Sequence, residues 1–160
     1  MKKLLFVAIC MMFAFASQAQ SNTDEVAFMQ SAYGMTKKQL ITDFMKITEA
    51  ESAKFWAIYE DYEVARKEYG KKRIDNIMGY AKAYGNMNNE SATTLIKASL
   101  ANQATFTKLL DKTFKKMSKE LNPVRAAQFV QVEMYLENVI RMEVLDQIPL
   151  IGELEKAQKK

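Results

Sequence analysis

The side chains in this sequence that could carry chemistry include one acidic group, Glu60, Asp61 and Glu63. Carboxylates at this spacing could bind a cation, but on a helix Glu60 and Glu63 point to one side while Asp61 diverges. The chain has no histidine, which is the commonest metal ligand and the commonest general acid or base. The group therefore predicts a solvated acidic face, and we expect no metal, no cofactor and no enzymatic activity.

A second set, Glu133, Glu137 and Arg141, is spaced by four residues along an otherwise apolar segment. Isolated buried charges are costly, so this spacing favours an ion-pair ladder inside a helical bundle over a catalytic carboxylate pair. Arg66 and Arg73 could pair with Glu133 or Glu137 across that bundle. Alternatively, the two arginines could present positive charge on a concave face that captures a partner polypeptide. No nucleophile elbow or phosphate-binding loop accompanies these residues, so no catalytic residue is predicted.

Methionine is abundant after residue 19, and clustered methionine thioethers can bind copper. None of these methionines are three or four residues apart, the spacing that would gather them on one helix face. Core filling is therefore the favoured interpretation. The residues are Met29, Met35, Met45, Met78, Met87, Met117, Met134 and Met142.

The composition indicates one globular, helical domain. Of the 160 residues 49% are hydrophobic, and two prolines and five glycines leave little for turn-rich β architecture. A single cysteine excludes an internal disulfide and a cysteine-cluster metal site. The formal net charge is +4, without a sustained lysine or arginine stripe, so no nucleic-acid partner is expected.

The first nineteen residues have the pattern of a signal peptide. Two lysines precede an apolar run over 4–16, and this run is shorter than the roughly 20 residues that span a bilayer. Small residues at Ser17 and Ala19 predict cleavage after Ala19, which leaves an exported chain of net charge +2 with no membrane span. The alternative is a lipid anchor at Cys10, which the bulky Ile9 before it disfavours.

Apolar residues after the leader recur at helical spacing, and no stretch alternates as a strand would. We expect an N-terminal helical segment over 20–47, with a break near Gly34 and a helix start at Thr36. A helical core domain over 48–149 follows, with helices over about 48–84, 90–121 and 123–147, and then a charged tail over 150–160. A capping box at Thr48 and Glu51 and the pair Asn122-Pro123 mark two of the starts. The short connections predict an all-α fold: an elongated antiparallel bundle of three long helices with a short N-terminal helix.

The second of these long helices has a row of apolar positions that we expect to face the bundle. They are Ala92, Leu95, Ile96, Leu100, Phe106, Leu110, Phe114, Met117 and Leu121.

Aromatic residues are concentrated on the first long helix, and this concentration has two interpretations. One is a packed helix face; the other is a face that binds client polypeptides, because tyrosine offers apolar area with a polar tip. Any part of that face extending beyond its partner helices would close a homodimer or remain as a binding surface. The candidate client-binding residues are Phe55, Trp56, Tyr59, Tyr62, Arg66, Tyr69, Arg73, Tyr80 and Tyr84.

The two predicted helix starts at 47–51 (Ile-Thr-Glu-Ala-Glu) and 121–125 (Leu-Asn-Pro-Val-Arg) both resemble the pattern Leu-Thr-x-x-Gln. That pattern, occurring twice in a small exported helical protein, is typical of the Spy/CpxP family of periplasmic stress proteins. Ile47 and Glu51 replace Leu and Gln in the first copy, and Asn122 and Arg125 replace Thr and Gln in the second. The stretches 55–63 and 140–149 are similar to uncharacterised envelope relatives of that family.

This resemblance implies a protein of the Gram-negative periplasm that binds unfolded clients or a sensor partner without ATP. Its expected mechanism is reversible contact through the aromatic face, with electrostatic capture by Arg66, Lys67, Lys71, Lys72 and Arg73. The alternative is a structural or regulatory envelope module that recognises one specific partner.

Overall fold

The computed structural model describes residues 36–147 and residue 151, and within these residues the chain is all-α with no strand. A short helix, α3 (Lys37–Met45), precedes three long helices: α4 (Glu49–Ala83), α5 (Asn89–Glu120) and α6 (Pro123–Gln147). One 3-10 turn, η2 (Tyr84–Asn86), follows α4. The predicted all-α bundle is confirmed, and each long helix begins and ends within one residue of its predicted bounds.

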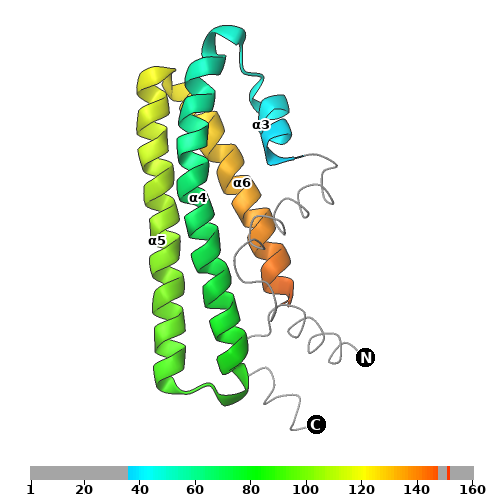
Figure 1. The fold of residues 1–160 in the computed structure, drawn as a ribbon, viewed down its shortest axis with the longest axis vertical. Coiled ribbons are helices and arrows are strands. Elements are labelled where there is room, and N and C mark those ends of the chain that lie inside the picture. The colour runs from blue at the N-terminus through cyan, green and yellow to red at the C-terminus, as the bar shows by residue number, and fades with distance from the viewer. Residues whose placement is uncertain (1–35, 148–150, 152–160) are drawn as a thin grey trace.

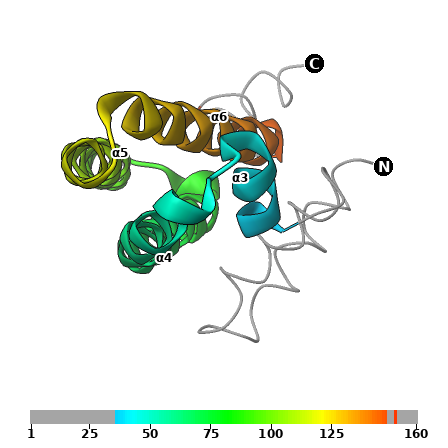
Figure 2. The same cartoon turned by 90° about the horizontal axis from the view of Figure 1, so that it is seen from above.

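The three long helices run alternately down, up and down the long axis of the molecule (Figure 1). Seen from above, α4 and α5 stand side by side, α6 runs obliquely along one side of this pair from beside α5 toward α3, and α3 lies on the side away from α5 (Figure 2). The connections between the long helices are only five residues (84–88) and two residues (121–122) long, and such short connections favour antiparallel neighbours.

Side-chain caps set the helix starts. Thr36 Oγ1 accepts a hydrogen bond from the Gln39 amide at 3.3 Å, and Gln39 Oε1 accepts from the Thr36 amide at 2.9 Å. Asn88 caps α5 by accepting from the amides of Glu90 and Ser91. Asn122 Oδ1 accepts from the Arg125 amide at 2.9 Å, immediately before the proline that opens α6. Each cap satisfies backbone donors that a helix start leaves without partners.

The buried core lies in the upper part of the bundle, where all four helices meet. It is made of aromatic and aliphatic side chains from α3, α4, α5 and α6, which pack at interior density and exclude water. These residues are Ile41, Met45, Phe55, Ile58, Tyr59, Tyr62, Tyr69, Phe106, Leu110, Met117, Ala126, Phe129, Val132, Leu136 and Ile140.

The lower ends of α4 and α5 extend beyond α6 as a two-helix hairpin (Figure 1). Between Tyr69 and Phe106 no described residue is fully buried. The expectation that Ile96 and Leu100 face the bundle is wrong, because both side chains are exposed. Two helices alone cover only one side of each other, and among the described residues no third helix reaches these two positions.

Several expectations fall on residues outside those that the structure describes. They are the signal peptide over 1–19, the break near Gly34 and the charged tail over 150–160, with the exception of residue 151. Among the described residues, no helix has an apolar stretch long enough to cross a bilayer.

Candidate functional site

The aromatic residues of α4 pack mainly inside the molecule. Phe55, Tyr59 and Tyr62 surround Phe129 of α6, with ring centroids 6.1, 6.2 and 5.1 Å from it and ring planes close to perpendicular. Tyr69 stacks on Phe106 of α5 at 4.8 Å. Edge-to-face and stacked aromatic pairs add to the stability that burial of their area provides. In this structure these four rings and Arg66 therefore belong to the core.

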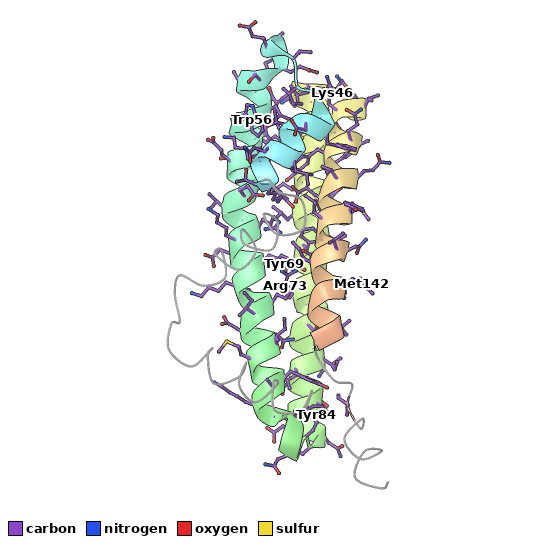
Figure 3. All side chains as sticks on the ribbon, turned by 90° about the vertical axis from the view of Figure 1, so that its right-hand side faces the viewer. Lys46, Trp56, Tyr69, Arg73, Tyr84 and Met142 are labelled. Carbon is purple, nitrogen blue, oxygen red and sulfur yellow. The ribbon has the colours of Figure 1, made fainter. Side chains whose placement is uncertain are left out.

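The other candidate client-binding residues are half-buried and do not lie together. Trp56 is near the upper end of α4 and Tyr84 at its lower end (Figure 3). The Trp56 ring packs edge-on against Phe55, with the Lys38 ammonium 4.7 Å from its centroid. Tyr80 and Tyr84 form a separate pair, 5.6 Å between centroids. The structure thus divides the predicted face into an upper part that is buried except for the half-buried Trp56, and a half-exposed lower pair.

A buried carboxylate, that of Glu133 on α6, joins three helices. It is 1% exposed. Its Oε2 accepts hydrogen bonds from the Tyr62 hydroxyl at 2.7 Å and from Lys37 Nζ at 2.8 Å, and Arg66 Nε lies 3.6 Å away. Lys37 also donates to Glu63 at 2.6 Å. Because a buried charge needs partners of opposite sign, this network fixes α3 and α4 against α6.

A second carboxylate, that of Glu137, repeats this arrangement one helical turn further along α6. Its Oε1 accepts hydrogen bonds from the Tyr69 hydroxyl at 2.5 Å and from Arg73 Nη1 at 2.8 Å. Tyr69 and Arg73 lie on the side of α4 that faces α6 (Figure 3). The pairing of Arg66 and Arg73 with the two glutamates is confirmed, and both guanidinium groups serve the bundle interior.

Burial and the glutamate partners change the ionisation of both tyrosines. Burial is the main cause that raises the pKa of Tyr69 to about 12, and its hydrogen bond to Glu137 adds to the effect. Burial likewise raises the pKa of Tyr62 well above the ordinary value, and the negative charge of Glu133 contributes. Both phenols therefore stay neutral as donors over the physiological range.

Each of the three acids of the possible cation site forms an ion pair with a different lysine. Glu60 lies 3.9 Å from Lys38 Nζ, Asp61 Oδ2 lies 2.7 Å from Lys116 Nζ, and Glu63 binds Lys37. The Lys116 hydrogen bond lowers the pKa of Asp61. Within the described part of the chain, no three Asp, Glu, His or Cys side chains are placed to hold a metal ion.

Glu51 and Arg125 bring the two helix-start segments together. Arg125 Nε donates to Glu51 Oε1 at 2.8 Å and Nη2 donates to Oε2 at 3.0 Å. Arg125 Nη1 also donates to the Met45 carbonyl at 2.7 Å, where α3 ends. The Arg125 hydrogen bond is the main cause that lowers the pKa of Glu51 to about 2. One arginine thus ties the end of α3 and the starts of α4 and α6.

The outward side of α6 carries no charged residue between 124 and 142. Positions at steps of three and four along this side are exposed, and Met142 projects away from α4 (Figure 3). By contrast, the exposed sides of α4 and α5 carry many lysines and acids. We call these residues the α6 outer face: Val124, Ala127, Gln131, Met134, Tyr135, Asn138 and Met142.

Sequence reasoning did not identify ion-pair partners that lie far apart in the chain. Lys37 and Glu133 are 96 residues apart, and nothing local marks Lys37 as an interior residue. The α6 outer face did leave a signal: its charge-free positions recur every three or four residues on the side opposite Phe129 and Leu136. The apolar pattern of the buried side is stronger, so this recurrence of uncharged positions on the outer side is easily overlooked.

No family model, no curated protein and no solved structure matches this chain.

Proposed function

We propose that this chain is an exported, ATP-independent binding protein of a Gram-negative periplasm, which holds apolar stretches of other polypeptides without catalysing a reaction. The resemblance of its two helix starts to the Spy/CpxP pattern and its signal-like first nineteen residues support the location. The observation that supports a binding activity is the α6 outer face, an exposed strip that carries no charged residue.

The α6 outer face suits such binding because its side chains tolerate water and also offer apolar area. From Val124 to Met142 the strip is about 27 Å long at 1.5 Å per residue. Methionine is unbranched and polarizable, so Met134 and Met142 adapt to different apolar partners. Gln131 and Asn138 lie on the same face, one before and one after Met134, and supply hydrogen bonds that any extended backbone could use.

The proposal places the binding surface on α6 instead of the aromatic residues of α4. Phe55, Tyr59 and Tyr62 fill the core around Phe129, so a client could reach them only after the bundle opened. Opening would separate the buried charges of Glu133 and its partners, which is costly. The α6 outer face needs no such rearrangement.

A second candidate function is recognition of one specific helical partner, such as an envelope sensor domain. The alternating steps of three and four along the α6 outer face favour it, because this is the spacing of a coiled-coil seam. A partner helix with a similar uncharged seam would pack along the whole strip.

The test compares lysine substitutions at exposed apolar positions of two different helices, two on α6 and one on α4. Met134→Lys combined with Met142→Lys places charge on the α6 outer face. Val64→Lys places charge at an exposed apolar position of α4, where the side chain is 69% exposed and surrounded by charged residues. Suppression of aggregation of an unfolded model client is then measured with each variant at several-fold excess.

We expect the unmodified chain and Val64→Lys to suppress aggregation equally, and the α6 variant to lose most of its activity. Equal activity of all three would exclude the α6 outer face as the binding surface. No suppression by the unmodified chain, together with capture of one partner that the α6 variant loses, would replace the general binding function with the specific one.

A further inference from the structure

The outward side of α5 carries a row of lysines, so the expectation that the chain has no lysine stripe is wrong for this helix. On a helix of 3.6 residues per turn, five lysines between 97 and 119 fall within about 60° of arc, opposite the buried side of α5 that holds Phe106 and Met117. All five side chains are exposed. We call them the α5 lysine ridge: Lys97, Lys108, Lys112, Lys115 and Lys119.

The ridge is the main concentration of positive charge in the bundle. Helix α5 has six lysines and three acids, a net charge of +3. Helix α4 has seven basic and seven acidic residues and is neutral, while α6 has two basic and four acidic residues. The modest charge of the whole chain therefore hides a strongly uneven distribution.

Most of the ridge is not neutralised by neighbouring acids. Lys115 pairs with Asp111 at 2.6 Å, and Lys116, beside the ridge, pairs with Asp61. The four other ridge lysines make no ion pair with another described residue, although Asp61 also attracts Lys112 over a longer distance. Asp111 and Glu120 lie to the sides of the ridge, outside its arc of about 60°.

The shape of the ridge fits a flat surface. The row is about 33 Å long on one straight helix, so all five ammonium groups can approach the same plane together. Ala101 and Ala104 occupy the positions between Lys97 and Lys108, and their short side chains do not hold that plane away. A folded acidic protein presents a curved and local patch, which would meet only part of such a row.

The chemistry of the ridge indicates phosphate-bearing lipid headgroups. Lysine is a hydrated point charge without the planar fork of arginine, so it suits diffuse attraction more than recognition of single bases or carboxylates. The ridge contains no aromatic residue on which a nucleic-acid base could stack. We propose that the α5 lysine ridge docks this protein on an anionic membrane surface.

Docking through α5 leaves the α6 outer face open. The two helices stand at different corners of the bundle, and the outward side of each points away from the centre (Figure 2). The protein would then lie along the membrane on α5 with its other long helices turned toward solution. This inference does not depend on the proposed function.

The experiment measures partitioning of the full chain onto vesicles of phosphatidylglycerol and phosphatidylcholine, with pure phosphatidylcholine vesicles as reference. The apolar run at 4–16 adds affinity for any bilayer, so the reference measures that contribution separately. The ridge variant is Lys108→Gln with Lys112→Gln and Lys119→Gln. The matched control, Lys67→Gln with Lys71→Gln and Lys72→Gln, removes three exposed charges from α4.

We expect the extra affinity for anionic vesicles to fall about 100-fold in the ridge variant, since each lysine near such a surface contributes about a factor of five. The α4 control is expected to change it by less than about fivefold, and raising NaCl from about 0.1 to about 0.5 M should abolish it. Helicity measured by circular dichroism checks that both variants are folded.

Three results would overturn the proposal. Equal losses in the ridge variant and the α4 control would show that only net charge matters. Equal binding to anionic and zwitterionic vesicles would remove the electrostatic basis. Tighter ridge-dependent binding to polyglutamate or to DNA than to vesicles would assign the ridge to a soluble polyanion.

Discussion

Glu51 and Arg125 form a bidentate salt bridge that connects the start of α4 to the start of α6. The two residues are 74 positions apart in the chain. These are the last residues of the two segments that resemble Leu-Thr-x-x-Gln. The last positions of the two segments therefore carry complementary charges, an acid at Glu51 and a base at Arg125. The pair also receives support from α3, because Arg125 binds the Met45 carbonyl.

Acid is expected to weaken this connection. The pKa of Glu51 is about 2 in the folded chain against an ordinary 4.5, so the ion pair stabilises the fold above about pH 4.5. That stability is lost as the pH falls from about 4.5 to about 2. Glu51→Gln should flatten this part of the pH profile of the free energy of unfolding, measured by urea titration. An unchanged profile would show that the pair does not contribute in solution.

Arg125→Gln should lower the free energy of unfolding at neutral pH more than Glu51→Gln does. The arginine variant removes the donor to the Met45 carbonyl as well as the ion pair, and a lost hydrogen bond of this kind typically costs about 1 kcal/mol. Equal effects of the two substitutions would contradict a role for Arg125 in holding α3.

Removal of the buried Glu133 carboxylate is expected to be strongly destabilising. Glu133→Ala leaves Lys37 and Tyr62 without their shared acceptor, and breaking such a buried pair typically costs about 3–5 kcal/mol. Glu133→Gln should cost less, because its amide oxygen still accepts from Tyr62. Thermal unfolding of the two variants in parallel measures the difference, and similar small losses would mean that the network is not essential.

Alkali should destabilise the contact between α4 and α6. The pKa of Tyr69 is about 12 when folded against an ordinary 10.0, so the neutral phenol stabilises the fold below about pH 10. This contribution is lost as the pH rises from about 10 to about 12. Tyr69→Phe should remove that step from the stability profile, and the tyrosinate absorbance should lose one late-titrating group. A normal titration of every tyrosine would contradict the burial of Tyr69.

Stability is expected to decrease from the upper to the lower end of the bundle. Phe129→Ala, in the core, should lower the free energy of unfolding by about 3–5 kcal/mol. Leu100→Ala, on the hairpin, should change it by less than about 0.5 kcal/mol. Hydrogen exchange should likewise be slow at 55–69 and faster at 74–83. Uniform protection would mean that another surface covers the hairpin.

The helices of this protein were predictable because their signals are local. Thr36, Asn88 and Asn122 cap helices through residues two or three positions away, and these contacts depend on neighbouring sequence alone. The apolar periodicity likewise identifies one side of each helix as interior, and Phe55, Tyr62 and Phe129 are buried accordingly.

The candidate site was less predictable, because the exposure of a side chain depends on whether another helix covers its side of the helix. The same helical spacing describes Tyr62 and Tyr84, yet Tyr62 is enclosed by Phe129 and Glu133, and Tyr84 lies at the half-exposed end of the hairpin. Ile96 and Leu100 have apolar side chains at helical spacing and are nevertheless exposed. A periodic pattern shows which residues share a side, but it does not show whether another helix reaches that side.

The sequence by itself determined the all-α fold, the bounds of the long helices and their antiparallel order, because caps, turns and periodicity act over a few residues. Only the tertiary structure decided where the core ends, which cations Glu133 and Glu137 bind, and which surfaces stay exposed. These outcomes depend on the relative lengths and positions of helices far apart in the chain. For this reason we propose binding surfaces on the outward sides of α5 and α6 instead of on the aromatic residues of α4.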